Sequence, residues 1–427
     1  MTLNKIIIAS LMIILINNAK YLYDYLLKTD TNHIKDHKLY LTPFLKNGKF
    51  DEAHKLAVVN HKEMFNIESY SGYLTVDEQY NSNLFFWYFP FKLDPKNDPV
   101  VLWLQGGPGA TSLWALFYQN GLFKIHNNKT LSKRQYSYSS NYNLIYIDSP
   151  VGIVYSFTDN NHGYARTESK VYKDLYSGLL QFYQLFPELQ GNPLFNSGEC
   201  YAGKYIPAFS YLIHPKNPTA KIRINLKGLI IGNGFVDPIS QMHFGYHLQE
   251  IGLLDLNGKV RFNLYEEKIR SLIKSNQLTT AVEVFDELLF NFPSVLSNLT
   301  GFKSYLFNYL DNQNSDDWDA LVDWIQRPDV RAAIHVSYDT PFKIINQTIL
   351  KYLQHEFMKS EADKIAALLT DYKVIFYNGQ LDMIIPYSSI ETAMLNLHWE
   401  GGDEFKKASR SVWWSGDELA GYVISHN

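Results

Sequence analysis

The sequence is almost without cysteine. Cys200 is the only one among 427 residues, so no disulfide bond can form within the chain. A stable fold therefore has to rest on packing alone. A chain of this length, 46% hydrophobic, is long enough to bury a substantial core. We expect the folded protein to withstand reducing agents.

An excess of charge of one sign is also missing. The chain has 39 basic and 43 acidic side chains, which leaves a formal net charge of -4. Proteins that bind nucleic acid usually present a strongly basic surface, so this balance excludes nucleic acid as an expected partner. Nothing in the sequence predicts a metal ion or a cofactor.

Long apolar runs are absent as well. The run near the start, residues 6–16, is too short to cross a bilayer, so we expect no stable membrane span. With Lys5 before it and Ala19 after it, the run predicts a secretory signal peptide over residues 1–20. The alternatives are an uncleaved anchor and, after it, a cytosolic apolar helix. Asn-x-Thr sequons at Asn128, Asn298 and Asn346 agree with a secretory route and predict glycosylation there.

The most informative stretch that is present is residues 196–205, Asn-Ser-Gly-Glu-Cys-Tyr-Ala-Gly-Lys-Tyr. A short apolar run that ends a strand precedes it, and a helix is expected over 205–213. A strand, a Gly-x-nucleophile-x-Gly turn and a helix form the nucleophile elbow of α/β-hydrolases. Small residues are needed on both sides of the nucleophile, and Gly198 and Ala202 provide them. Serine is expected at the centre, where this chain has Cys200. The alternative is an ordinary glycine-rich turn.

The rest of the chain alternates strands and helices. Aromatic and β-branched runs predict a hairpin, and continuous apolar runs predict buried strands. Apolar residues spaced by three and four from Val171 to Phe186 predict a helix that covers a sheet. Strands are expected at 68–76, 83–89, 99–104, 143–148, 227–232 and 372–377. This order predicts an α/β fold, with a mostly parallel central sheet flanked by helices. Residues 235–371 predict a helical insertion over the cleft, and residues 21–65 an irregular arm.

Two predicted strands end in loops that could carry chemistry. Gln-Gly-Gly-Pro-Gly at 105–109 lets backbone N–H groups approach a substrate closely, because glycine has no Cβ. Asp382, just beyond the strand at 372–377, is well placed to orient a histidine. The alternative for residues 105–109 is an ordinary glycine turn. The alternative for Asp382 is an aspartate that only forms a turn or caps a helix.

These motifs together resemble the serine carboxypeptidases. Residues 198–205 match the family's Gly-Glu-Ser-Tyr-Ala-Gly-Lys-Tyr at seven of eight positions, and Asn-Gly-Gln-Leu-Asp at 378–382 matches the loop of its triad acid. The glycine loop resembles the family's Asn-Gly-Gly-Pro-Gly motif, and its first residue is Gln105, as in the vitellogenic-like branch of the family. The resemblance covers roughly residues 40–423, so residues 21–427 are expected to form one hydrolase domain.

The resemblance implies a role for each motif residue. Cys200 and Asp382 would take the positions of the nucleophile and the acid. The N–H groups of Gly107 and Tyr201 would form the oxyanion hole. The residues implied to hold the C-terminal carboxylate of a peptide are Gln105, Gly106 and Glu199. Glu199 would do so protonated, which favours acidic pH.

The family's catalytic base is lacking. No Gly-His-x-x-Pro loop occurs, and we expect the family's C-terminal strand and closing helix to be missing. His335, His398 and His426 lack the context of that base. The resemblance therefore implies a secreted or lysosomal carboxypeptidase-type hydrolase whose activity is weak or lost. The alternatives are a non-catalytic peptide-binding protein and a truncated copy of an active enzyme. The thiol of Cys200, at a helix N-terminus, is expected to have a lowered pKa.

Overall fold

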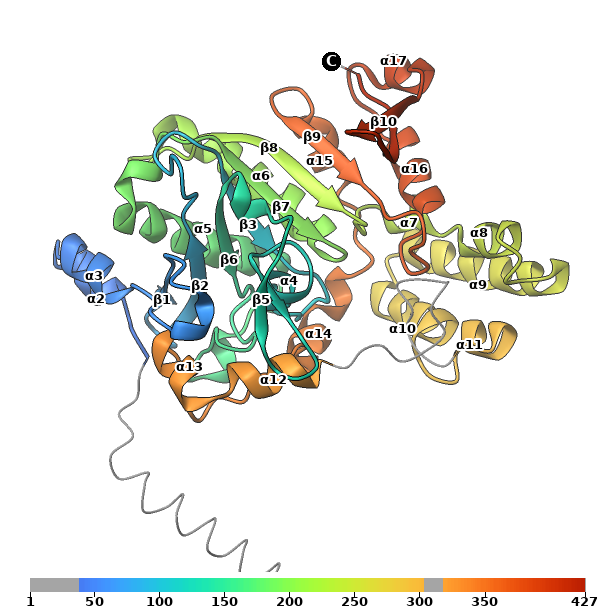
Figure 1. The fold of residues 1–427 in the computed structure, drawn as a ribbon. Helices are drawn as coiled ribbons and strands as arrows, with labels where there is room; N and C mark the ends of the chain where they lie inside the picture. Colours follow the sequence, from blue (N-terminus) through green and yellow to red (C-terminus); the bar gives the residue numbers. More distant parts are fainter. Residues whose placement is uncertain (1–37, 303–317, 427) are drawn as a thin grey trace, which may run out of the picture. The chain divides into compact units, whose positions relative to one another are not determined.

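A seven-stranded sheet forms the centre of the fold (Figure 1). The computed structural model describes residues 38–302 and 318–426, so the predicted signal peptide lies outside the described residues. The strand order across the sheet is β1-β2-β6-β3-β7-β8-β9. The strands are β1 (Tyr70–Asp77), β2 (Ser82–Phe89), β3 (Val100–Leu104), β6 (Asn143–Ile147), β7 (Leu194–Glu199), β8 (Leu226–Gly232) and β9 (Lys373–Tyr377).

Five neighbouring strands of this sheet, from β6 to β9, are parallel, and β1 and β2 add an antiparallel edge. The strands β3 and β6 are buried along their whole length, as expected for parallel strands covered on both faces. The predicted hairpin, the predicted buried strands and the mostly parallel sheet are therefore confirmed.

Helices pack against the sheet and against one another. Helix α6 lies against the sheet, where it contacts β7 and β8, and it also contacts the helices α5 and α15. The longer helices and those of the sheet layer are α4 (Ser112–Tyr118), α5 (Glu168–Leu185), α6 (Ala202–Lys216), α8 (Phe244–Glu250), α9 (Leu256–Lys274), α10 (Leu278–Leu289) and α15 (Ala362–Leu368). The predicted stripe on α5 is buried from Val171 to Phe186. Thr167 caps this helix by accepting a hydrogen bond from the N–H of Lys170.

The predicted insertion between β8 and β9 is helical. It contains α7 to α15, interrupted by residues 303–317, which lie outside the described residues. Its shorter helices are α7 (Pro238–Gln241), α11 (Val295–Thr300), α12 (Asp319–Ile325), α13 (Pro328–Ala333) and α14 (Gln347–Leu353). Within it, α8, α9 and α10 pack side by side. Another part of it, residues 344–346, hydrogen-bonds the loop after β3 through Gly109 and Thr111.

The region after residue 37 is more regular than its sequence predicts. Two short helices, α2 (Thr42–Lys46) and α3 (Phe50–Leu56), stand where we expected an irregular arm. Leu41, Leu45 and Ala53 anchor them in the core, although most of their other residues face solvent. Three apolar contacts spread over two helices are too sparse to give a periodic signal in the sequence.

The chain also forms structure outside the main sheet. β4 (Phe123–Ile125) pairs with β5 (Leu131–Lys133), and β10 (Ser411–Ser415) pairs with β11 (Glu418–Val423). Two more helices, α16 (Tyr387–Leu395) and α17 (Gly402–Lys407), follow β9. Strand β9 is the last strand of the main sheet, and both Ile375 and Tyr377 on it are exposed.

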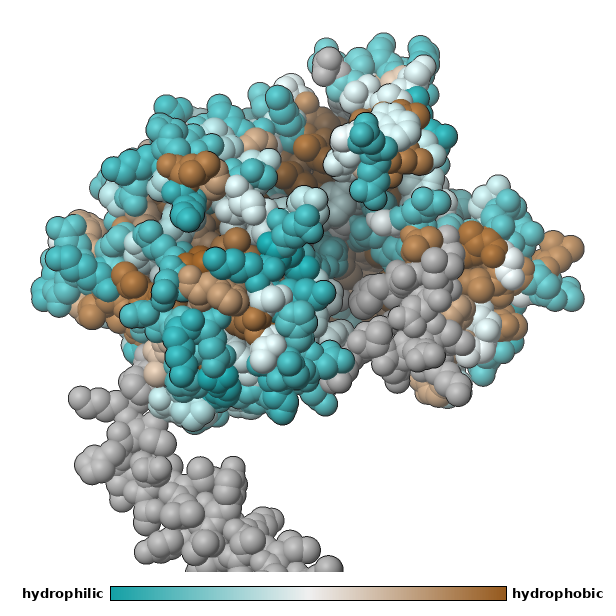
Figure 2. All heavy atoms as spheres, viewed as in Figure 1, coloured by the Kyte–Doolittle hydropathy of each residue, from teal (hydrophilic) through white to brown (hydrophobic). Residues whose placement is uncertain are grey.

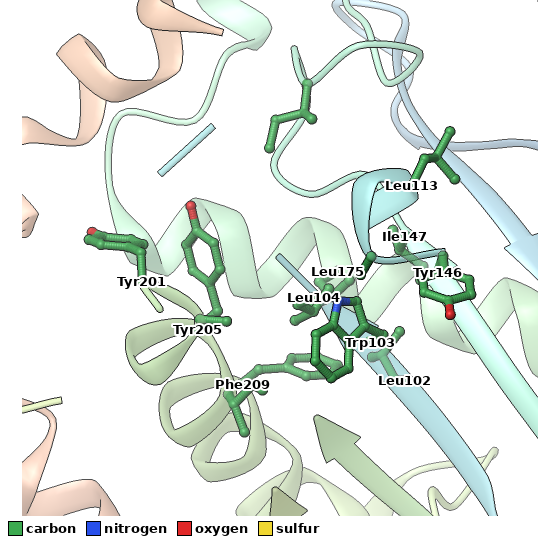
Figure 3. Packing of buried hydrophobic residues seen from close by; sticks show 14 of the residues in the cluster. Leu102, Trp103, Leu104, Leu113, Tyr146, Ile147, Leu175, Tyr201, Tyr205 and Phe209 are labelled. Atoms are coloured by element: carbon green, nitrogen blue, oxygen red, sulfur yellow. The ribbon is translucent and has the colours of Figure 1, made fainter. Parts of the chain in front are cut away.

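The core beneath the site is rich in aromatic residues. Tyr201, Tyr205 and Phe209 follow one another at every fourth position of the α6 region, and all three are buried (Figure 3). Trp103 on β3 is fully buried as well. Large buried rings on both elements fix the helix firmly on the sheet. Within the described ranges, no helix is long and apolar enough to cross a membrane.

Candidate active site

Cys200 stands at the sharp turn between β7 and α6. Its φ angle is +61°, in the left-handed region that residues other than glycine rarely adopt. The N–H of Cys200 donates to the carbonyl of Gly232 at 3.1 Å. Its carbonyl accepts from the N–H groups of Gly203 and Phe235, both at 2.9 Å. The turn therefore has the geometry of a nucleophile elbow, with Cys200 at its tip.

Glycines allow the strand and the helix to meet at this turn. A Cβ on Gly198 would lie 2.2 Å from the carbonyl oxygen of Leu104 and 2.7 Å from the Cβ of Ala202. A Cβ on Gly106 would lie 2.6 Å from the backbone nitrogen of Tyr201. Both distances are shorter than real Cβ contacts. Glycine is therefore required at 198 and at 106 for the glycine loop to lie against the elbow.

Two backbone N–H groups converge on the side chain of Cys200. The N–H groups of Gly107 and Tyr201 both hydrogen-bond its sulfur. One comes from the glycine loop after β3 and the other from the residue after the nucleophile position. The same two donors supply the oxyanion hole of α/β-hydrolases. The arrangement can thus stabilise negative charge next to the atom at the tip of the elbow.

A buried network holds the glycine loop. Asp148, just after β6, accepts the hydroxyl of Thr111 at 2.6 Å and the N–H of Ser112 at 3.0 Å. The hydroxyl of Ser112 donates to the carbonyl of Ile147 and accepts the N–H of Gln105 at 3.1 Å. Burial raises the pKa of Asp148 to about 7. The hydroxyls of Thr111 and Ser112 thus fix the loop without a cysteine.

A second buried network fixes Tyr201. Its hydroxyl donates to the carboxyl of Glu168 on α5 at 2.5 Å, and both side chains are inaccessible to solvent. Burial raises the pKa of Glu168 to about 7. The buried Lys204 on the next turn of α6 donates to the carbonyl of Lys359. These contacts tie Tyr201 and the start of α6 to α5 and to the insertion.

The implied carboxylate-binding residues lie together beside the elbow. Glu199 precedes Cys200, and the side chain of Gln119 on the loop after α4 donates to both of its carboxylate oxygens, at 2.8 and 2.7 Å. Gln105 also hydrogen-bonds Glu199. Burial raises the pKa of Glu199 to about 7, although these amide donors act in the opposite direction. Glu199 is therefore protonated at mildly acidic pH.

Asp382 follows β9, at the same end of the sheet as the elbow. Asn233, at the end of β8, donates to one of its oxygens at 2.5 Å, and the backbone N–H groups of Ile384 and Ile385 donate to the other. Burial raises the pKa of Asp382 to about 6. Its charge in turn raises the pKa of both Cys200 and Glu199, which indicates that the three side chains are close.

The three candidate histidines lie elsewhere. His335 hydrogen-bonds the hydroxyl of Ser71, His398 is exposed, and the ring of His426 packs against Trp399 with 5.9 Å between centroids. Over residues 38–302 and 318–426, no hydrogen bond joins a histidine to Asp382 or Cys200.

The thiol of Cys200 differs from our expectation. Burial raises its pKa to about 11, and the nearby Glu199 adds to the effect, while the two N–H donors oppose it only partly. The expected lowering at a helix N-terminus is therefore wrong for this site. Cys200 is partly buried and faces carboxylates instead of cations, and both conditions disfavour the thiolate.

Alkylation of Cys200 by iodoacetamide should be slow in the folded chain. A rise in pKa from 9 to about 11 lowers the thiolate fraction at neutral pH by roughly a hundredfold, and the thiolate is the nucleophile. The measurement is the labelling rate at neutral pH before and after addition of urea, where the denatured chain is the control for intrinsic reactivity. Equal rates in both states would contradict the raised pKa of the partly buried thiol.

The predicted glycosylation sites differ in their surroundings. Asn128 and Asn298 are exposed. The amide nitrogen of Asn346 instead donates to the carbonyl of Gly152 at 2.6 Å, and its oxygen caps α14 through the N–H of Thr348. A glycan on Asn346 would break the first of these bonds.

Two residues of the site escaped the sequence analysis. Gln119 comes from the end of a helix fourteen positions after Gln105, and Asn233 lies in a strand-end turn that carried no catalytic pattern. The sequence did contain one signal for Asn233. The Gly-Asn-Gly turn at 232–234 ends a strand at the same edge of the sheet as Cys200 and Asp382. The order of the strands in the sheet decides which side chains Gln119 and Asn233 contact, and the spacing of motifs along the sequence does not reveal that order.

A parallel sheet, an elbow after a central strand and a glycine loop against that elbow define the α/β-hydrolase class. Comparison with known proteins then gives the family. The sequence model of the serine carboxypeptidases matches residues 60–427, so the chain belongs to the serine carboxypeptidase family.

The relatives agree with this result and with the predicted branch. Venom serine carboxypeptidase of Apis mellifera is 50% identical over 389 residues, covering 90% of this chain and 83% of that protein. Vitellogenic carboxypeptidase of Aedes aegypti and probable serine carboxypeptidase CPVL of Homo sapiens are each 40% identical, covering 90% of this chain and 82% of theirs.

A solved structure supports the fold. The prohormone-processing carboxypeptidase Kex1(delta)p of Saccharomyces cerevisiae superposes with a TM-score of 0.75 at 22% identity, covering 86% of this chain and 89% of that one. The predicted α/β-hydrolase fold is confirmed.

Proposed function

We propose that this member of the serine carboxypeptidase family binds the C-terminal carboxylate of peptides in the secretory pathway or in lysosomes, and that it hydrolyses them weakly or not at all. The observation that carries the proposal is the contrast between the two halves of the site. The groups proposed to bind the carboxylate and the oxyanion lie next to Cys200, whereas the hydrogen bonds of Asp382 go to Asn233 and to backbone N–H groups.

The proposed binding half has donors suited to a carboxylate. A peptide carboxylate next to the elbow would receive the proton of Glu199 and a hydrogen bond from the amide of Gln105, and Gly106 leaves room for close approach. Gln119 keeps Glu199 in place. Buried donors aimed at one group give strong selectivity, because an uncharged analogue leaves them unpaired.

The catalytic half lacks two functions. A protonated thiol is a poor nucleophile, and no histidine among the described residues can take its proton. Asp382 would orient such a base and cannot replace it. The geometry of the elbow favours one second candidate, an active carboxypeptidase, since the φ angle of Cys200 and the two N–H donors suit acyl transfer.

An N-blocked dipeptide with a free carboxylate should bind better than its amide, and more so at low pH. Glu199 is protonated below about pH 7, so its proton is available at about pH 5, whereas at about pH 8 two carboxylates repel each other. The affinity for the acid should fall roughly tenfold between these two values, and the affinity for the amide should not change. Calorimetric titration measures both.

Glu199→Gln is the matched control for this experiment. It keeps a donor at every pH, so the affinity for the acid should become independent of pH. Equal affinities of the acid and the amide at about pH 5 would remove the proposed carboxylate site.

A further inference from the structure

Arg134 differs from most cations of the chain in its surroundings. Hydrophilic side chains, drawn in teal, cover most of the face of the molecule in Figure 2, and most of the described lysines are exposed. Arg134 is half-buried instead, and burial lowers the pKa of its guanidinium. Over residues 38–302 and 318–426, no carboxylate forms an ion pair with it. A cation that is removed from water in this way needs other polar partners.

Three backbone carbonyls around the end of α4 are those partners. The Nη2 of Arg134 donates to the carbonyls of Phe117 at 2.8 Å and Phe123 at 3.3 Å, and its Nε donates to the carbonyl of Gly121 at 3.2 Å. The last carbonyls of a helix have no partner within the helix, and a basic side chain can bind them. The local fold brings Arg134 there, because it directly follows β5 and its N–H donates to the carbonyl of Leu122 at 2.8 Å.

The turn that Arg134 binds is the one that carries Gln119. Two of the three carbonyls lie two positions before and two positions after Gln119. The turn is also tight. The N–H of Gln119 donates to the carbonyl of Ala115 at 3.0 Å, and a Cβ on Gly121 would lie 2.2 Å from the carbonyl oxygen of Leu116. Arg134 thus fixes the backbone on both sides of Gln119.

The side chain of Gln119 depends on this backbone for its position. Its Nε2 donates to both carboxylate oxygens of Glu199, at 2.8 and 2.7 Å. Its Oε1 is buried and accepts no hydrogen bond from the part of the chain that the structure describes. No second polar contact therefore orients the amide, and a shift of the turn would draw it away from Glu199.

The carboxyl of Glu199 provides a measure of this contact. Burial raises the pKa of Glu199 to about 7, and the hydrogen bonds from Gln119 oppose that rise. The titratable groups that interact electrically with Glu199 are Asp382, Cys200, Tyr138 and Tyr377. Arg134 is not one of these groups, so its effect on Glu199 would act through the position of Gln119.

We propose that Arg134 is a positioning residue of the site: by binding three carbonyls it fixes the turn after α4, and thereby keeps the amide of Gln119 on the carboxyl of Glu199. The role of Glu199 in binding a peptide carboxylate rests on the proposed function, whereas its contact with Gln119 does not. The proposal extends the site to a residue whose own side chain donates to backbone carbonyls.

Arg134→Met tests the proposal, because methionine keeps an unbranched side chain but removes the donors. The proton affinity of Glu199 should rise about tenfold, which moves its titration to higher pH, as expected when a carboxylate loses hydrogen bonds. The measurement is an NMR titration of the full chain with isotope-labelled glutamate carboxyl carbons, in which Glu199→Gln identifies the signal. Arg134→Lys keeps the charge but not the planar fork, so it should cause a smaller shift in the same direction.

Two controls accompany the titration. Arg166→Met removes a cation that donates to the carbonyl of Asn161 at 3.3 Å instead of to the end of α4, so the titration of Glu199 should not change. In a chain that carries Gln119→Leu, Arg134→Met should add no further shift, because the amide through which it acts is gone. Near-equal melting temperatures verify that the variants fold, and Arg134→Lys decides if Arg134→Met does not fold.

Three results would overturn the proposal. They are an unchanged titration of Glu199 in Arg134→Met or Arg134→Lys, an equal shift in Arg166→Met, and a full shift in the Gln119→Leu chain. The titration uses no peptide, so it is independent of the proposed function. If the titration shifts as expected but the parent chain binds no N-blocked dipeptide, the proposed function is wrong and the positioning role stands.

Discussion

Substantial release of a C-terminal amino acid should appear only when two changes are made together. The first is Cys200→Ser, and the second is an appended segment with a family-type final strand, a Gly-His-x-x-Pro loop and a closing helix. A serine hydroxyl needs a positioned base to take its proton, and the appended histidine needs Asp382 to orient it. Neither change alone supplies both partners.

The expected gain is large and not additive. General base catalysis contributes about 10²–10⁴-fold, so the doubly changed chain should turn over at least about a hundredfold faster than either single variant. Triad members act as a unit, so the product of the two single effects should fall far below the combined effect. Hydrolysis of an N-blocked dipeptide at acidic pH by all four proteins is the measurement.

Asp382→Asn in the doubly changed chain is the control for this experiment. The asparagine keeps the size of the side chain but cannot stabilise the imidazolium, so activity should fall by about 10⁴-fold. Strong turnover by the unmodified chain, or by Cys200→Ser alone, would show that another residue acts as the base and would refute our interpretation of the site.

Gly198→Ala should destabilise the fold severely. The added methyl group would overlap the carbonyl oxygen of Leu104 at 2.2 Å, and neither the strand β3 nor the helix α6 can move away, because both are packed by buried aromatic rings. Overpacking of a well-packed core costs about 1–3 kcal/mol and sometimes more, and a backbone clash in the central layer belongs at the upper end. The free energy of unfolding, measured by urea titration, should fall by about 3 kcal/mol or the variant should fail to fold.

Gly191→Ala is the matched control for this substitution. Gly191 lies in the turn before β7, and an added Cβ there meets no atom within 4 Å. This variant should be as stable as the parent chain within about 0.5 kcal/mol. If both alanine variants unfold at the same urea concentration, the close approach at Gly198 does not limit the fold.

The sequence predicted the parts of the molecule that repeat a local rule. Buried parallel strands are continuous apolar runs, the stripe on α5 has helical spacing, and the elbow combines small residues with a fixed turn. The contacts that complete the site are different. Gln119 reaches Glu199 from a separate helix, and Asn233 reaches Asp382 across two strands, so both depend on the sheet order. The predicted lowering of the Cys200 pKa was wrong for a related reason. Burial and the neighbouring carboxylates, which come from other parts of the fold, outweigh the effect of the helix terminus.

The position of β9 has a consequence for the order in which the protein assembles. Strand β9 pairs with β8, but the whole insertion, residues 233–372, separates the two along the chain. Closing so long a loop costs entropy, and distant pairings form late, whereas strands β1 to β8 are joined by shorter connections. During synthesis from the N-terminus, the turn at Cys200 is therefore complete before Asp382 has left the ribosome. The hydrogen bonds of the elbow itself go to Gly203, Gly232 and Phe235, all of which precede Asp382 in the chain, so we expect the elbow to form without help from the acid.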